Sequence, residues 1–224
     1  MIDYTVIYLT ANLIPEYFFE YQKDILLKAT PAPIISISRK PIDLGHNILD
    51  NGEKSTDNIY RQMLRAAKLA DTKYIIIAED DTLYSPDHFT FFRPKDNAFG
   101  YNRNRATLFT WGEPVFHWRN RLSNCSLIAP RKLLIESLEE RFEKWPDIIP
   151  DSKVGELGRS MVDKRLGVTV RNCEEAYSKV NIIQFNHING SEERQKTMRK
   201  SYGQIMAYDI PYWGKAADVV KLFK

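Results

Sequence analysis

Extended and helical sequence patterns alternate along the first 80 residues, and this alternation limits what the chain can fold into. Runs of β-branched and aromatic residues predict strands at 4–10, 33–38 and 74–78. Apolar residues at helical spacing predict helices at 15–29 and 55–70 between them. Strands that alternate with helices form parallel sheets, which bind ligands beyond the carboxyl ends of their strands. We therefore expect an α/β domain with a central, mainly parallel sheet flanked by helices.

Residues 40–53, in the first half of the chain, carry the proline, glycine, asparagine and aspartate residues of a loop, which separates the second expected strand from the second helix. The second half of the chain has a less regular pattern. Further strands are expected at 105–111, 126–129 and 182–185, and helices from Pro130 through Leu138 and at 155–166. A polar, basic segment follows the last of these strands.

Length and composition indicate one globular unit. The chain has 224 residues, of which 43% are hydrophobic and 27% charged, which suits a single substantial core. The formal net charge of +3 permits a polyanionic partner without requiring one. Cys125 and Cys173 are too few and too far apart for a disulfide framework or a cysteine-based zinc site, so both are expected as reduced thiols.

The N-terminus and the hydrophobic runs predict a cytoplasmic protein. An apolar run begins at Tyr4, which leaves no room for a basic segment, a signal-peptide hydrophobic stretch and a cleavage site. No apolar run approaches the roughly 18 residues of a membrane-spanning helix. We therefore expect no membrane insertion.

Three consecutive carboxylates follow the buried-type strand at 74–78, and they are the strongest chemical signal in the sequence. Glu79, Asp80 and Asp81 would repel one another at a strand end unless a cation lay beside them. Hard divalent ions such as Mn²⁺ and Mg²⁺ prefer oxygen ligands, and they neutralise a departing diphosphate. The alternative is an acidic turn that is merely solvated.

The motif and its surroundings resemble a known family. The stretch from Tyr74 to Phe89, with Pro86 and Asp87, is similar to the DXD region of GT-A glycosyltransferases in its EDD form. The resemblance implies a single GT-A, Rossmann-like domain over residues 1–224, with 1–81 binding a nucleotide-sugar such as a UDP-sugar and 82–224 binding the acceptor. It also implies Asp81 as the direct ligand of Mn²⁺ or Mg²⁺, with Glu79 binding the metal through water or the donor sugar and Asp80 contacting the ribose or the sugar.

Other positions match the usual order of landmarks in that family. The resemblance implies donor-binding roles at the ends of the first two strands, in the helix before the motif and in a glycine-containing acceptor loop: Thr10, Asn12, Arg39, Asp43, Arg61 and Gly112. For Arg61, a solvated basic helix face is the alternative. His187, which follows the last core strand, would complete the metal shell, although a lone histidine is ordinarily a surface or core residue.

The catalytic base of inverting members is an acid near the start of a helix, where it takes the proton of the attacking hydroxyl. The segment from Gly155 to Gly167 resembles that region, and Glu156 is the candidate base. A glutamate in a first helical turn is also favoured by the helix dipole alone. Asp151 and Glu113 are the reserve candidates.

Arginines and aromatic residues alternate through residues 101–121. Arginines neutralise phosphates and aromatic rings stack on unpaired bases, so a nucleic-acid contact is one interpretation, and core aromatics with solvated or donor-binding arginines are the other. The candidate nucleic-acid residues are Arg103, Arg105, Trp111, Trp118, Arg119 and Arg121, with a second basic group at Arg194, Lys196, Arg199 and Lys200. The resemblance then extends to small phage and base J transferases that glycosylate hydroxymethylated pyrimidines, with DNA as acceptor.

Several functions stay open at this point. The acceptor could instead be a glycan, a lipid-linked sugar or a protein, because the fold does not choose among them. A nucleotidyltransferase would use related carboxylates, but the segment TANLIPEY after the first strand lacks a glycine-rich phosphate loop. A non-catalytic DNA-binding module has no need for three carboxylates together with His187.

Overall fold

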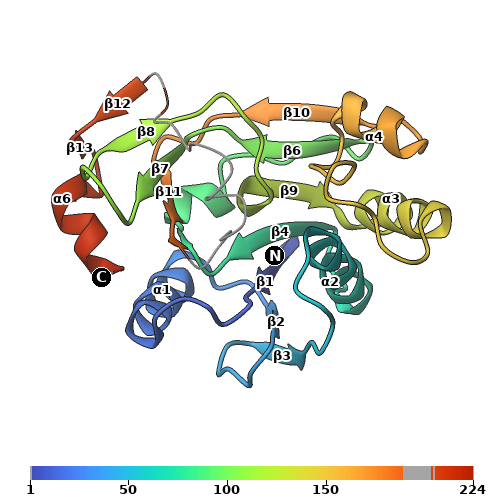
Figure 1. The fold of residues 1–224 in the computed structure, drawn as a ribbon, viewed down its shortest axis with the longest axis horizontal. Coiled ribbons are helices and arrows are strands. Elements are labelled where there is room, and N and C mark those ends of the chain that lie inside the picture. The colour runs from blue at the N-terminus through green and yellow to red at the C-terminus, as the bar shows by residue number, and fades with distance from the viewer. Residues whose placement is uncertain (1, 189–202, 204, 224) are drawn as a thin grey trace.

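A computed structural model describes residues 2–188, 203 and 205–223, which form a mixed α/β domain (Figure 1). Its main sheet has the strand order β10-β6-β9-β4-β1-β2-β3. The bounds are β1 (Tyr4–Leu9), β2 (Ile34–Ser38), β3 (His46–Leu49), β4 (Tyr74–Glu79), β6 (Ala98–Asn102), β9 (Leu127–Pro130) and β10 (Asn172–Ala176). The expected central sheet is confirmed.

The directions of the strands create a switch point at β1. β1 pairs in parallel with β2 on one side and with β4 on the other, and β2 pairs in parallel with β3. β9 is antiparallel to both of its neighbours, β4 and β6, while β10 is parallel to β6. The chain moves outward from β1 in both directions, so the carboxyl ends of β1 and β4 mark the edge where open α/β sheets bind ligands.

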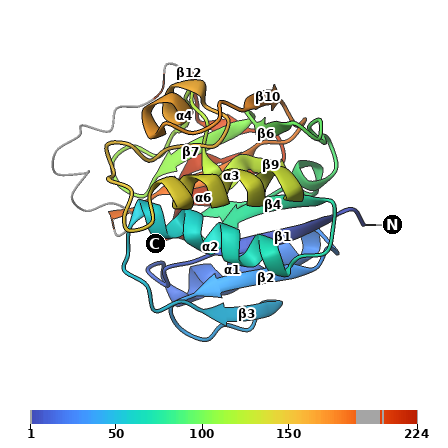
Figure 2. The same cartoon turned by 90° about the vertical axis from the view of Figure 1, so that its right-hand side faces the viewer.

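Helices cover both faces of this sheet because alternate strand residues are apolar on each face. Ile7, Ile35 and Ile75 share one core cluster with apolar residues of α2 (Thr56–Leu69) and α3 (Arg131–Lys144). Figure 2 shows these two helices lying next to each other over that face. Val6 and Ile76 belong to a second cluster on the opposite face, with residues of α1 (Glu16–Ala29).

A second sheet, of order β12-β8-β7-β11-β5, lies beyond the end of β4. Its strands are β5 (Thr82–Leu83), β7 (Arg105–Phe109), β8 (Phe116–Trp118), β11 (Ile182–Asn186) and β12 (Ile205–Ala207). The C-terminal elements follow as β13 (Asp209–Ile210), β14 (Gly214–Lys215), α6 (Ala216–Val219) and the 3-10 turn η4 (Val220–Leu222). Phe18 of α1, Phe185 of β11 and Phe223 pack together and join the two sheets.

The remaining elements show where the sequence patterns were incomplete. Residues 40–53 were expected as a loop but contain β3, whose mixed exposure hides the strand pattern. The helix expected at 155–166 begins only at Ser160, as α4 (Ser160–Leu166), because the preceding Gly158 takes a left-handed φ of +74°. The strand expected at 105–111 ends at Phe109. No helix in the described part of the chain is both long and apolar enough to cross a bilayer.

A buried histidine follows the acidic motif in the short 3-10 helix η1 (Pro86–Phe89). His88 is completely buried, and its Nδ1 lies 3.0 Å from the Asn102 side-chain nitrogen. Burial, helped by the positive charge of Arg93, lowers the pKa of His88 to about 3. The folded protein therefore keeps this ring neutral at pH values where the unfolded chain protonates it.

We predict that His88 makes the fold sensitive to acid. A folded pKa below the ordinary value of 6.5 gives stability that is present above pH 6.5 and is lost as the pH falls towards 3, by about 2 kcal/mol at pH 5. The stability difference between wild type and His88→Asn, measured by urea unfolding, should therefore shrink between pH 7.5 and pH 5. His46→Asn, at an exposed position, is the control. A difference that stays constant with pH would contradict the prediction.

Candidate functional site

The acidic motif lies at the switch point of the main sheet. Glu79 ends β4, and Asp80 and Asp81 form the turn into β5, all three half-buried. The Phe185 amide of β11 donates to the Asp81 carbonyl at 2.8 Å, and the Thr82 hydroxyl donates to Asp81 Oδ1 at 2.9 Å. The second sheet thus fixes the turn that carries the carboxylates.

The three carboxylates repel one another in this setting. Burial raises the pKa of Glu79 to about 8, and the charges of Asp81 and Asp80 add to the effect. Burial and the charge of Asp81 raise the pKa of Asp80 to about 7, against a hydrogen bond from Thr10 that lowers it. Uncompensated negative charge of this kind, on hard oxygen atoms, suits a divalent cation.

The ends of β1 and β2 are tied to this centre. Thr10 Oγ1 donates to Asp80 Oδ2, and the Asn12 amide donates to Thr10 Oγ1 at 2.8 Å. Asn12 has a left-handed φ of 52°, and its Oδ1 accepts from the amides of Arg39 and Lys40 at 2.8 and 2.9 Å. The Arg39 guanidinium donates to the Gly52 carbonyl. Thr10, Asn12 and Arg39 therefore lie at the carboxyl edge, as expected.

Arginines of β7 and of the segment after β8 act electrostatically on the carboxylates. The charges of Arg105 and Arg121 both lower the pKa of Glu79, which places them within electrostatic range of it. Arg105 is buried and donates to Thr107, to Gln184 and to the Arg121 carbonyl. Burial and repulsion from Arg121 and Arg105 lower the pKa of Arg119. We name Arg105, Arg119 and Arg121 the arginine cluster.

The rest of the expected nucleic-acid row has a structural role. Arg103 is buried, ion-paired with Glu175, bonded to Asn120, and lies with its guanidinium carbon 5.5 Å from the Trp118 ring centroid. Trp118 Nε1 donates to the Arg103 carbonyl at 2.8 Å. Both residues hold the second sheet to its neighbours, which favours the alternative of structural residues over a nucleic-acid contact. Arg194, Lys196, Arg199 and Lys200 lie outside the described residues.

Two expected donor-binding residues also lie elsewhere. Arg61 is ion-paired with Asp57 at 2.7 Å, its guanidinium covers the Phe142 ring, and it donates to the carbonyls of residues 145–147. It fastens α2 to the end of α3 and is not placed to contact a donor. Asp43 is exposed in the loop before β3, where its charge acts on Lys23 of α1. No described contact links Asp43 to the acidic centre.

The loop between β7 and β8 carries the expected glycine. Gly112 has a φ of +74°, a conformation that glycine adopts without strain. Trp111 beside it is 39% exposed and packs against Phe109. Glu113, a reserve candidate for the base, accepts a hydrogen bond from the Tyr208 hydroxyl at 2.7 Å. The loop thus presents an exposed aromatic ring on the second sheet.

The candidate base is not at a helix start. Glu156 lies four residues before α4 and pairs with Arg159 at 3.1 Å, so the alternative explanation, a glutamate favoured by the helix dipole, does not apply. Burial raises the pKa of Tyr60, and the charges of Glu156 and Glu79 raise it further. Tyr60 therefore lies within electrostatic range of both carboxylates. The reserve candidate Asp151 is exposed in the turn after Pro150.

His187 follows β11, two residues after the Phe185 amide that bonds Asp81. It is buried, and its ring lies 5.1 Å from that of Phe223. Within residues 2–188, 203 and 205–223, no three His, Cys, Asp or Glu side chains are arranged so that they could hold a metal ion. A metal here would need further ligands from its substrate, and the metal roles of Asp81, Glu79 and His187 stay predictions.

Sequence reasoning missed several residues around this edge. Asp50, after β3, is buried and accepts hydrogen bonds from Asn58, Gln62 and Arg65. Burial raises its pKa, but the hydrogen bonds from Gln62 and Asn58 outweigh this and leave it below its ordinary value. Asn124 exchanges hydrogen bonds with the Tyr60 hydroxyl. Only the acidic type of Asp50 was visible in the sequence.

Comparisons with known proteins give structural likenesses only. No family model matches the chain, and neither does any curated protein sequence. Among solved structures, S. aureus TarS with UDP-GlcNAc has a TM-score of 0.48 at 12% identity, covering 82% of this chain and 58% of that one. The 2-C-methyl-D-erythritol 4-phosphate cytidylyltransferase from Thermus thermophilus has a TM-score of 0.47 at 11% identity, covering 79% of this chain and 89% of that one.

The Drosophila β-1,4-galactosyltransferase 7, solved with manganese, UDP-Gal and xylobiose, has a TM-score of 0.43 at 12% identity, covering 90% of this chain and 77% of that one. Sugar transferases and nucleotidyltransferases thus stand side by side in this set. A proposal about function therefore rests on the strand order and on the charges at the edge of the sheet.

We predict that the metal-free protein loses stability as the pH rises. The folded pKa of Glu79 lies above its ordinary value of 4.5, so its contribution to stability is present below pH 4.5 and is lost as the pH rises through about 8. Asp81→Asn removes part of the repulsion and should raise the Tm of the metal-free protein at pH 8 by about 2–4 °C, with less effect at pH 5.

Differential scanning fluorimetry in the presence of a chelator measures this change. Asp71→Asn, at an exposed acid before the other end of β4, is the matched control and should leave the Tm unchanged. Mn²⁺ should raise the Tm of wild type and of Asp71→Asn, but not that of Asp81→Asn. A lower Tm for metal-free Asp81→Asn at pH 8 would show that the carboxylates do not repel one another.

Proposed function

We propose that this protein is a metal-dependent glycosyltransferase that moves a sugar from a nucleoside-diphosphate sugar, a UDP-sugar first, to an acceptor hydroxyl. One observation carries the proposal: the carboxylates lie at the switch point of the main sheet, and the positive charges of Arg105 on β7 and of Arg121 after β8 act on them. A nucleoside diphosphate has the charge to bridge two such groups, with a cation on the carboxylate side and guanidinium groups on the other.

The residues present fit a divalent ion. Asp81 and Glu79 would hold it, with His187 as a further ligand, and phosphate oxygens and water would complete a shell that the protein alone does not build. Mn²⁺ and Mg²⁺ both accept such ligands. When bound, the ion would neutralise the diphosphate as it leaves. Arg105 and Arg121 would hold the same diphosphate from the opposite side.

The remaining roles follow from position. Thr10, Asn12 and Arg39 surround the end of β1, where the nucleoside of a donor would lie beyond the strands. Asp80, held by Thr10, would contact the ribose or the sugar. Glu156 would take the proton from the acceptor hydroxyl, and attack from the side opposite the leaving diphosphate would invert the anomeric carbon.

The acceptor that we propose to test first is DNA with hydroxymethylated pyrimidines. Exposed Trp111 can stack on an unpaired base, and the arginine cluster next to the carboxylates can neutralise a phosphate. Arg103 and Trp118 take no part, so this surface is smaller than the sequence indicated. Glycans, lipid-linked sugars and proteins are the other acceptors for the assay.

We predict UDP release from UDP-sugars that depends on Mn²⁺ and on the acceptor, with Asp81→Ala inactive. Release with hydroxymethylcytosine DNA, together with a hexose-sized mass gain on the digested nucleoside, identifies acceptor and donor together. Release that needs a glycan, lipid-linked or protein acceptor contradicts DNA but keeps the transferase. Pyrophosphate release from a nucleoside triphosphate and a sugar phosphate would instead assign a nucleotidyltransferase.

We also predict that Arg121→Gln raises the KM for the donor by about tenfold, since a charge-assisted hydrogen bond to a phosphate is worth about 1.5–3 kcal/mol. Steady-state kinetics with the UDP-sugar measures the change. Lys132→Gln, at a solvent-facing position of α3, is the control for loss of one positive charge. An equal effect of both variants would remove the arginine cluster from the donor site.

A further inference from the structure

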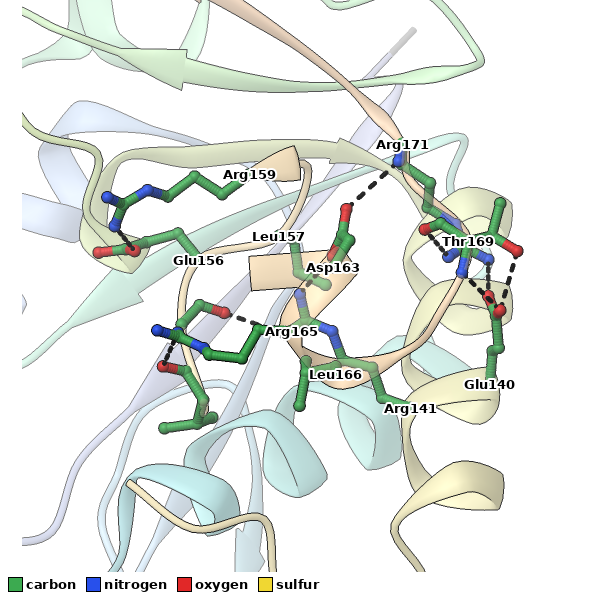
Figure 3. A network of polar contacts seen from close by, with 12 residues as sticks. Glu140, Arg141, Glu156, Leu157, Arg159, Asp163, Arg165, Leu166, Thr169 and Arg171 are labelled. Carbon is green, nitrogen blue, oxygen red and sulfur yellow. Dashed lines mark hydrogen bonds and ion pairs between the residues drawn. The ribbon is translucent and has the colours of Figure 1, made fainter. Parts of the chain in front are cut away.

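Side chains from three elements hold the backbone around Glu156. Arg165 of α4 donates from Nη2 to the Lys153 carbonyl at 2.9 Å and from Nε to the same oxygen at 3.1 Å. Its Nη2 also lies 3.4 Å from the Val154 carbonyl. Figure 3 shows the side chains of Arg141, Glu156 and Arg165 around this segment.

The carbonyl groups of Gly155 and Leu157, the residues on either side of Glu156, each accept a hydrogen bond from a buried side chain. Arg141 of α3 donates from Nη1 to the Gly155 carbonyl at 3.0 Å. The hydroxyl of Tyr101, on β6, donates to the Leu157 carbonyl at 2.9 Å. Both donors are buried, Arg141 at 1% exposure and Tyr101 at 0%. Arg141 thus fixes the peptide group that joins Gly155 to Glu156, and Tyr101 fixes the one that joins Leu157 to Gly158.

Arg141 is itself fixed in place. Its Nη2 lies 3.1 Å from Asp163 Oδ1 of α4, and its guanidinium covers the ring of Tyr60 at 5.4 Å. A buried ion pair of this kind adds little to stability relative to apolar packing, but it fixes geometry where its partners are bonded. Asp163 is bonded further, because its Oδ2 accepts from the Arg171 amide at 3.2 Å.

The segment also carries two glycines that are closely packed. A Cβ on Gly155 would lie 2.8 Å from Val162 Cγ2. A Cβ on Gly158 would lie 2.8 Å from the Asn172 carbonyl oxygen, and its φ of +74° suits glycine. A side chain at either position would therefore meet its neighbours.

We infer that Arg141 and Tyr101 are positioning residues that hold Glu156 at the height of the acidic centre. This inference rests on the proposed role of Glu156 as the base that accepts the acceptor proton. A misplacement of about 1 Å in such a group costs up to a hundredfold in rate, so fixing the peptide groups at Gly155–Glu156 and Leu157–Gly158 has a direct effect on turnover. We call Arg141 and Tyr101 the clamp; the ring of Tyr60, on α2, lies against the Arg141 guanidinium, and its hydroxyl is bonded to Asn124.

The test uses conservative variants of the two clamp residues. Tyr101→Phe removes only the donor to Leu157. Arg141→Lys keeps the buried charge but loses the planar fork that reaches Gly155 and Asp163 together. Tyr74→Phe is the matched control, since it removes a buried hydroxyl that donates to the Pro94 carbonyl at 3.3 Å, at the start of β4. The measurements are amide hydrogen exchange of residues 153–158 in the metal-free protein, kcat with saturating donor and acceptor, the Kd for Mn²⁺ and UDP, and the Tm.

We expect both clamp variants to speed exchange at the amides of Glu156 and Gly158 and to lower kcat about tenfold, with the Kd for Mn²⁺ and UDP unchanged. Tyr74→Phe should lower the Tm without lowering kcat. Unchanged exchange in Tyr101→Phe and Arg141→Lys, or faster exchange without a fall in kcat, overturns the inference, as does an equal fall in kcat for Tyr74→Phe. Failure of wild type to bind UDP with Mn²⁺ would reject the proposed function, while the exchange result still decides whether the clamp exists.

Discussion

The parallel pairing of β4 with β1 is the constraint from which the site follows. It brings three carboxylates from one chain segment against the end of the neighbouring strand, where Thr10 donates a hydrogen bond to Asp80. The strand itself is apolar and buried, so its end cannot move into water without breaking the sheet. The repulsion among the carboxylates therefore follows from the fold, and the positive charges of Arg105 and Arg121 partly offset it.

The fold was predictable where the sequence pattern repeats. The two helices and three strands of the first 80 residues are confirmed, because each buries a face whose spacing is visible in the chain. The second half was harder for a physical reason. β6 and β10 pair across a wide gap in sequence, and β8 and β12 are short strands whose pairing depends on contacts rather than on local pattern. A strand such as β3, with exposed ends, carries no clear alternation.

The candidate site was predictable in residue type and less so in partner choice. Three adjacent acids after a buried strand indicated their own location, since a strand end fixes where its next residues lie. An arginine carries no such information, because its long side chain reaches whatever acid or carbonyl the fold brings close. Arg61 thus joins α2 to the end of α3, Arg103 pairs with Glu175, and the charge of Arg105 acts on Glu79. The sequence around each arginine does not distinguish these roles.

Glu156, the base in the proposed function, is held without a helix terminus. At the start of a helix, backbone amides would both stabilise the charge of the carboxylate and fix its position. Here the helix begins four residues later, and different groups have these two effects. Arg159 supplies the positive charge, and buried side chains hold the carbonyls of Gly155 and Leu157. A carboxylate paired with a half-exposed arginine can exchange that partner for a substrate hydroxyl, while its backbone stays fixed. Such an arrangement suits a group that has to release one contact in order to make another.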